Sequence, residues 1–146
     1  MTQTLTERPT VAARRMGYVV GAVVNVALLY AVDIWPGWEV VPFLTAEAAS
    51  VLVLVNLSIV TNLAANAVYL VYDEAWLKAL GSILTTTVGM ITLVRIWQVF
   101  PFDFGGSSIN WQLVTRFLLI IGIVGSDIGI IVAFIALVKS FAARNN

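Results

Sequence analysis

The chain of 146 residues contains no cysteine and no histidine, and only 11% of its residues are charged. Without cysteine it can form no disulfide, no thiol redox relay and no thiolate metal site. Without histidine it also lacks the commonest haem and zinc ligand and the usual general base near neutral pH. We therefore expect no metal site, no cofactor and no catalytic residue, and we expect that the protein is not an enzyme.

The scarcity of charge also excludes a water-soluble protein. Soluble domains have roughly 25% charged residues, whereas this chain has 11% charged and 60% hydrophobic residues. So apolar a sequence is not typical of disorder either. The eight basic and eight acidic residues balance to a net charge of zero, so nothing favours a nucleic-acid partner. The composition indicates an integral membrane protein, whose first partner is the lipid bilayer.

Four apolar stretches are long enough to cross a bilayer as helices, which takes roughly 20 residues. They cover residues 16–34, 46–72, 76–100 and 111–141, with a polar tail at 1–13 and a short tail at 142–146. The four prolines all lie outside these stretches, as unbroken helices require. The sequence therefore predicts a single all-α membrane domain, an antiparallel bundle of four transmembrane helices.

The basic residues predict the orientation of this bundle. The predicted loops 35–45 and 101–110 contain no Lys or Arg, and Arg95 and Arg116 lie just inside the neighbouring helix ends. The other six basic residues fall at the opposite end, and they are Arg8, Arg14, Arg15, Lys78, Lys139 and Arg144. Because basic residues favour the cytoplasmic side, we expect both termini in the cytoplasm and the protein in the cell membrane.

The two outer loops share the pattern W-x-V-x-P-F, which occurs at Trp38–Phe43 and again at Trp97–Phe102. One interpretation is that the chain consists of two related helical hairpins. The other is that Trp, Phe and Pro gather at membrane interfaces and loop starts without any duplication. In either case we expect an aromatic outer rim, and its members are Trp35, Trp38, Trp97, Phe100, Phe102, Phe104 and Trp111.

Polar side chains recur near the middle of the predicted spans, where they are costly. We expect them to form one intramembrane polar site, and they are Asn25, Ser58, Thr61, Asn62, Asn66, Thr85, Thr86 and Asp127. This layer is either a hydrophilic path between helices or a set of hydrogen bonds that join neighbouring helices. Asp127 differs from the rest because a carboxylate at this depth must be protonated or have a polar partner.

Small residues predict where helices pack closely. They occur at helical spacing in the first and fourth spans, and they are Gly17, Gly21, Gly122, Gly125, Ser126 and Gly129. Such residues let two helices approach each other, either within one chain or between chains. In the fourth span we place them roughly opposite Asp127, so that this helix has two specialised faces. The pattern favours a second chain packed on the fourth helix.

We weigh three functions. The first is a non-catalytic membrane subunit or scaffold that packs against copies of itself or against another membrane protein. The second is a small proton- or cation-coupled transporter or channel that uses the polar layer and Asp127. The third is an enzyme that acts on lipid or quinone, but no nucleophile with an orienting partner is recognisable. The first agrees best with the missing catalytic residue types and the small-residue faces.

Overall fold

The computed structural model describes residues 9–146, so Arg8 and most of the expected polar tail lie outside the described residues. Four α-helices make up the chain: α1 (Val11–Asp33), α2 (Ala48–Val71), α3 (Ala75–Val99) and α4 (Trp111–Arg144). A short 3-10 helix, η1 (Trp38–Val40), precedes α2. All four α-helices are long and apolar enough to span a membrane, and no strand occurs between residues 9 and 146. The prediction of an all-helical protein with four such helices is confirmed.

Local side chains explain where the helices begin and end. Thr10 and Asn110 accept hydrogen bonds from the third residue of α1 and of α4, at 3.1 and 3.0 Å, which satisfies amide groups that a helix start leaves free. After α3, Phe100 has a left-handed backbone with φ of 46°, and Pro101 follows it. Because α1 begins at Val11, Arg14 and Arg15 lie within this helix and do not precede it.

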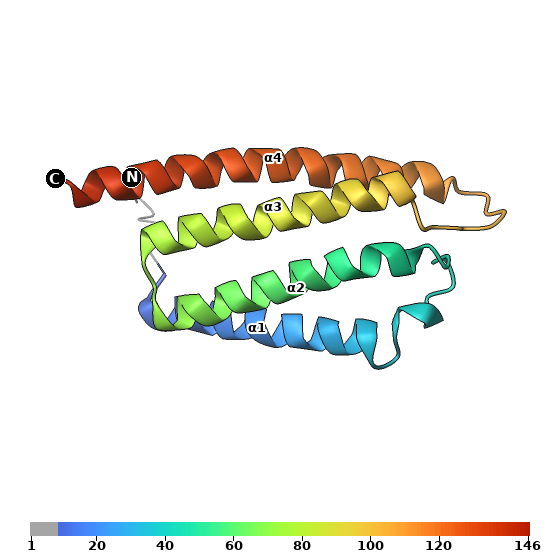
Figure 1. Ribbon diagram of the computed structural model, residues 1–146, viewed down its shortest axis with the longest axis horizontal. Coiled ribbons are helices and arrows are strands. Elements are labelled where there is room, and N and C mark those ends of the chain that lie inside the picture. Colours follow the sequence, from blue (N-terminus) through green and yellow to red (C-terminus); the bar gives the residue numbers. More distant parts are fainter. Residues whose placement is uncertain (1–8) are drawn as a thin grey trace, which may run out of the picture.

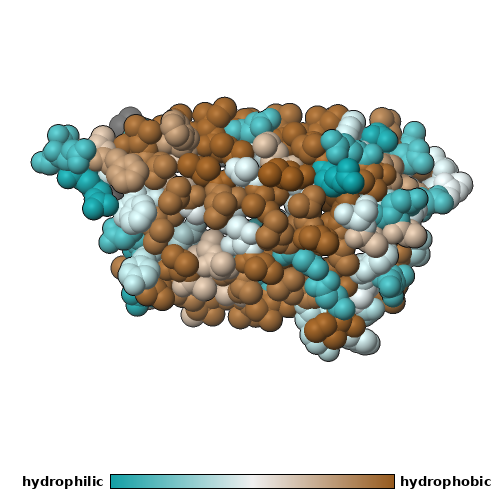
Figure 2. All heavy atoms as spheres, viewed as in Figure 1, coloured by the Kyte–Doolittle hydropathy of each residue, from teal (hydrophilic) through white to brown (hydrophobic). Residues whose placement is uncertain are grey.

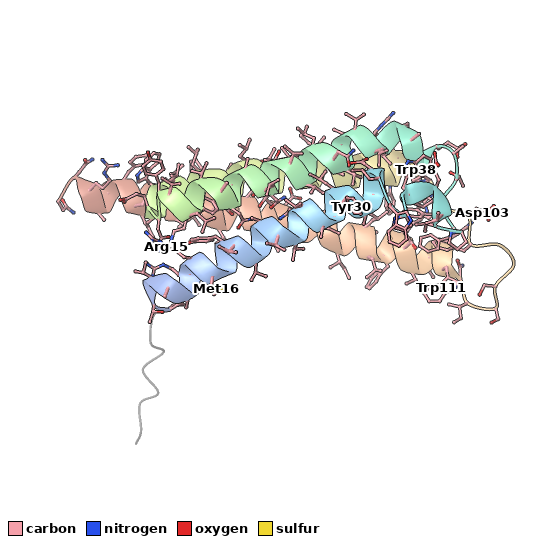
Figure 3. All side chains as sticks on the ribbon, turned by 90° about the horizontal axis from the view of Figure 1, so that it is seen from below. Arg15, Met16, Tyr30, Trp38, Asp103 and Trp111 are labelled. Carbon is pink, nitrogen blue, oxygen red and sulfur yellow. The ribbon has the colours of Figure 1, made fainter. Side chains whose placement is uncertain are left out.

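The helices form an open antiparallel row, in the order in which they occur in the chain (Figure 1). Within residues 9–146, α1 packs on α2, α2 on α3 and α3 on α4, and α1 does not contact α4. Seen from the perpendicular direction, α1 runs obliquely across the other helices (Figure 3). The expected bundle is therefore open. Both α1 and α4 keep a face that no other helix in the described part of the chain covers.

Few side chains are buried in such an arrangement. The buried apolar residues are Ala48, Val51, Ala79, Leu119, Ala133 and Pro101. Most are small, so they allow neighbouring helices to pack closely but form little hydrophobic core. The large apolar side chains cover the middle of the molecule, and hydrophilic residues gather mainly at its two ends (Figure 2). A surface of this kind suits hydrocarbon rather than water.

Candidate functional site

The polar side chains near the middle of the helices bond mainly to their own helices. Asn25, Asn62 and Asn66 each donate a side-chain hydrogen bond to the carbonyl oxygen four residues earlier, at 2.7 to 2.9 Å. Thr61 does the same to Leu57 at 2.6 Å. These bonds satisfy the donors without joining two helices. One interpretation of the polar layer is a set of hydrogen bonds between neighbouring helices. These four side chains do not donate such bonds.

One hydrogen bond in the middle of the row does join two helices, and the sequence did not single it out. The buried hydroxyl of Thr92 in α3 shares its proton between two carbonyl oxygens, that of Leu54 in α2 at 3.1 Å and that of Val88 in its own helix at 2.8 Å. Thr92 belongs to a run of small and polar residues on α3. Only the packing of α2 on α3 distinguishes it from Thr85, whose hydroxyl bonds to Ser82 in its own helix.

Several of the predicted residues meet across helix pairs through close packing. A Cβ atom at Gly21 of α1 would lie 2.9 Å from the side-chain oxygen of Asn66 in α2. At the next interface, Ser58 of α2 lies 3.9 Å from the Cβ position of Gly89 in α3. Glycine at position 21 lets Asn66 approach the backbone of α1, whereas a Cβ atom at Gly89 would make only an ordinary van der Waals contact with Ser58. The polar face of α2 therefore divides between α1 and α3.

On α4, some of the expected small residues face α3. The side chain of Leu93 lies 3.0 Å from the Cβ position of Gly122, and that of Thr86 lies 3.6 Å from the Cβ position of Gly129. Ser126 lies between them and donates to the carbonyl oxygen of Gly122 at 2.8 Å. In contrast, a Cβ atom at Gly125 would meet nothing within 4 Å, and the same holds for Gly17 of α1. The predicted small-residue stripe of α4 therefore has two parts. Gly122, Ser126 and Gly129 face α3, whereas Gly125 is not covered by any described residue.

Asp127 lies apart from the other members of the predicted polar site. It is the seventeenth of the 34 residues of α4, and its side chain is exposed. Within residues 9–146 its carboxylate makes no hydrogen bond and no salt bridge. Because α4 packs only on α3, the polar side chains of α2 do not reach it. This carboxylate thus projects from an apolar helix at its midpoint, without a partner among the described residues.

The end of the molecule where α1 begins and α4 ends contains a charged cluster that the sequence did not predict. Asp73, between α2 and α3, forms salt bridges of 2.8 Å with Arg14 of α1 and Lys78 of α3, and it accepts a hydrogen bond of 2.9 Å from the hydroxyl of Tyr18. The hydrogen bonds from Lys78, Arg14 and Tyr18 hold the pKa of Asp73 well below its usual range. Asp73 therefore joins three helices at one end.

At the opposite end the two outer loops pair with each other. The amide of Thr45 donates to the carbonyl oxygen of Pro101 at 3.0 Å, and the amide of Asp103 donates to that of Phe43 at 2.8 Å. Leu44 and Phe102 thus form an isolated antiparallel bridge. The two W-x-V-x-P-F segments differ locally, because the first begins in η1 and the second in the last turn of α3. Their Pro-Phe ends nevertheless meet, with Phe43 and Phe102 6.5 Å apart between ring centres.

The aromatic rim forms two groups around these loops, and Phe100 belongs to both. The guanidinium of Arg116 lies over the rings of Trp97 and Phe100, at 4.8 and 4.2 Å from their centres, in a cation–π arrangement. Phe102 meets the edge of Phe100 and stacks on Phe104, at 5.3 and 5.8 Å. Trp35 is 70% exposed and stands outside both groups. The sequence placed Arg116 just inside the helix end but did not predict its aromatic partners.

A cavity of about 920 Å³ lies between the loops and the first two turns of α4. We call it the loop cavity. The aromatic part of its lining comes from Phe43, Phe102, Phe104 and Trp111, and Val114 and Leu118 extend it along α4. Asp103 is its one charged lining residue in the described part of the chain. Trp38, Asp103 and Trp111 all lie at this loop end of the molecule (Figure 3).

The described residues contain no group of three or more acidic side chains placed to hold a metal ion. Comparisons with models of known protein families, with curated proteins and with solved structures found no match. The geometry of the chain itself is therefore the basis for any functional proposal.

Proposed function

We propose that this protein is a non-catalytic subunit of an assembly in the cell membrane, packed against copies of itself or against another membrane protein. The exposed carboxylate of Asp127 carries this proposal. It projects from the middle of α4, eleven residues from Arg116 and twelve from Lys139. An ionised carboxylate at the centre of a bilayer costs roughly 2.5–3.5 kcal/mol on insertion scales. A polar group from a second chain would lower this cost.

The open row of helices supports the same proposal. No helix within residues 9–146 covers the outer faces of α1 and α4, and the open glycines Gly17 and Gly125 lie on these two helices. Small residues on an uncovered face allow another helix to approach closely. Lipid could fill these faces, but lipid tails would leave Asp127 without a polar partner.

A small proton- or cation-coupled transporter is the alternative. Its support is the position of Asp127 at the middle of α4. Two observations weigh against it. Asp127 and the polar residues of α2 lie on helices that do not touch, and those side chains bond largely within α2. A path through this chain alone would therefore lack a continuous polar lining.

The test measures the mass of the protein after gentle extraction from its own membrane. Native mass spectrometry should show a fixed oligomer or a co-purifying chain for the wild type. Asp127→Leu removes the polar group and should weaken the assembly roughly three- to thirtyfold, which corresponds to a hydrogen bond of about 0.6–2 kcal/mol between membrane helices. Ile131→Leu, which places the same leucine at an exposed apolar position one turn away, is the control.

Asp127→Asn separates the proposal from its alternative. Asparagine keeps the shape and the hydrogen-bonding capacity, so the assembly should persist in this variant. If Asp127→Asn abolishes proton-coupled uptake while the assembly stays intact, the transporter hypothesis is correct. A wild-type protein that is a lone monomer without any co-purifying chain would contradict the subunit proposal.

A further inference from the structure

The loop cavity combines apolar walls with a single carboxylate. Its volume of about 920 Å³ lies within the range of small-molecule sites, roughly 300–1,000 Å³. One end is formed by the paired loops with Asp103, and the other by Val114 and Leu118 of α4. A molecule that fills it therefore meets a negative charge at one end and hydrocarbon at the other.

Asp103 is held in place by bonds that leave part of its carboxylate available. Its backbone amide donates to Phe43 at 2.8 Å, and its Oδ1 atom accepts a hydrogen bond from the amide of Gly105 at 3.0 Å. The Oδ2 atom makes no hydrogen bond or salt bridge within residues 9–146. This oxygen can accept a positively charged group without breaking an existing contact.

The rings beside Asp103 are also arranged to receive a cation. Phe43, Phe102 and Phe104 form a triangular cluster, in which the ring centre of Phe104 lies 5.6 Å from that of Phe43 and 5.8 Å from that of Phe102, and the other two centres are 6.5 Å apart. All three rings line the cavity together with Asp103, and the face of an aromatic ring is its negative region. Arg116 is engaged with Trp97 and Phe100 and does not line the cavity. Arg116 therefore does not pair with the carboxylate of Asp103.

We propose that the loop cavity binds an amphiphile with a net positive ammonium head and an apolar chain. The head lies between Asp103 and the phenylalanine rings, and the chain follows Val114 and Leu118 along α4. An anionic head is rejected because Asp103 repels it. A neutral head gains neither the charge pairing nor the cation–π contact. This site is independent of the Asp127 face, so either proposal can fail without the other.

The experiment uses the full chain in a non-ionic detergent and follows tryptophan fluorescence. The probe is 6-bromohexyltrimethylammonium, whose bromine quenches an indole on contact. The chain-matched 6-bromohexanesulfonate and 6-bromohexanol carry an anionic and a neutral head. We expect saturable quenching by the ammonium alone, and we expect Trp111→Phe to remove it because Trp111 lines the cavity. Hexylphosphocholine, which has a zwitterionic lipid-like head, should compete poorly because its phosphate brings a negative charge close to Asp103 and cancels the charge of its ammonium.

Two variants test whether the charge of Asp103 contributes to binding of the ammonium probe. Asp103→Asn keeps an acceptor for the Gly105 amide and should raise the dissociation constant about two- to fivefold, as for an exposed charge pair. Glu39→Gln, an acid of the other outer loop outside the cavity lining, should leave it unchanged. Equal binding of all three bromohexyl probes, equal competition by hexylphosphocholine, or an unchanged affinity in Asp103→Asn would overturn the proposal.

Discussion

At the scale of single residues, the charged groups with most contacts lie at the ends of the helices. Asp73 is 14% exposed and contacts Arg14 and Lys78 at 2.8 Å. Its contacts tie the start of α1 to the turn between α2 and α3. Apart from this contact, α1 packs only on α2 and near η1. The salt bridge between Asp73 and Arg14 therefore fixes the first turns of α1 against the turn between α2 and α3.

Asp73→Asn should lower the thermal unfolding midpoint at pH 7, measured by circular dichroism in detergent. The folded state lowers the pKa of this carboxyl, so its contribution is complete above the unfolded pKa of about 3.9. It is lost as the pH falls through the lower folded pKa. The difference from wild type should therefore stay constant down to about pH 5 and shrink below about pH 4. The neighbouring Glu74→Gln is the control, and an equal loss there would refute the assignment.

At the scale of the elements, contacts at both ends of the row join the hairpin of α1 and α2 to the hairpin of α3 and α4. The contact at one end is the Asp73 cluster, and the contact at the other end is the bridge between Leu44 and Phe102. The sequence indicated that the two loops resemble each other. It did not indicate that they pair, because pairing depends on the distance between α2 and α3 at their outer ends.

The paired loops predict a specific cross-link. In an antiparallel bridge flanked by hydrogen bonds, as here, facing Cα atoms lie about 4.5 Å apart, close enough for a disulfide. Leu44→Cys/Phe102→Cys should therefore form an intramolecular disulfide on mild oxidation. The wild-type chain has no cysteine, so the background is zero. The readout is faster migration on a non-reducing gel. Each single variant serves as a control, and cross-linking only between chains would show that the loops do not pair.

At the scale of the whole molecule, antiparallel helices bring the start of α1 and the end of α4 to the same end of the row (Figure 1). The basic residues outside the outer loops predict that this end is cytoplasmic. With the outer faces of α1 and α4 uncovered, the row is built to be completed by lipid or by another chain.

Single cysteines test the orientation directly. Ser108→Cys, in the outer loop, should react with a membrane-impermeant maleimide in intact cells, and Asn146→Cys should react only after permeabilisation. Both side chains are exposed, so access to the reagent depends on the side of the membrane. The reverse labelling pattern would mean that the count of basic residues predicts the wrong orientation.

The sequence by itself determined the four helices and their approximate limits. Long apolar stretches require a helix in hydrocarbon, because each backbone group must then bond within its own segment. It also placed the prolines outside the helices, since a proline such as Pro101 acts on adjacent residues. These features depend on neighbours along the chain.

Only the tertiary structure decided which faces meet. Helical spacing grouped Gly122, Gly125 and Gly129 on one face, but the rotation of α4 against α3 packs two of them and leaves Gly125 open. The same rotation directs Asp127 away from α3. The Asp73 cluster and the pairing of the loops likewise join residues far apart in sequence. Such contacts depend on how helices are placed against each other, which local periodicity does not specify.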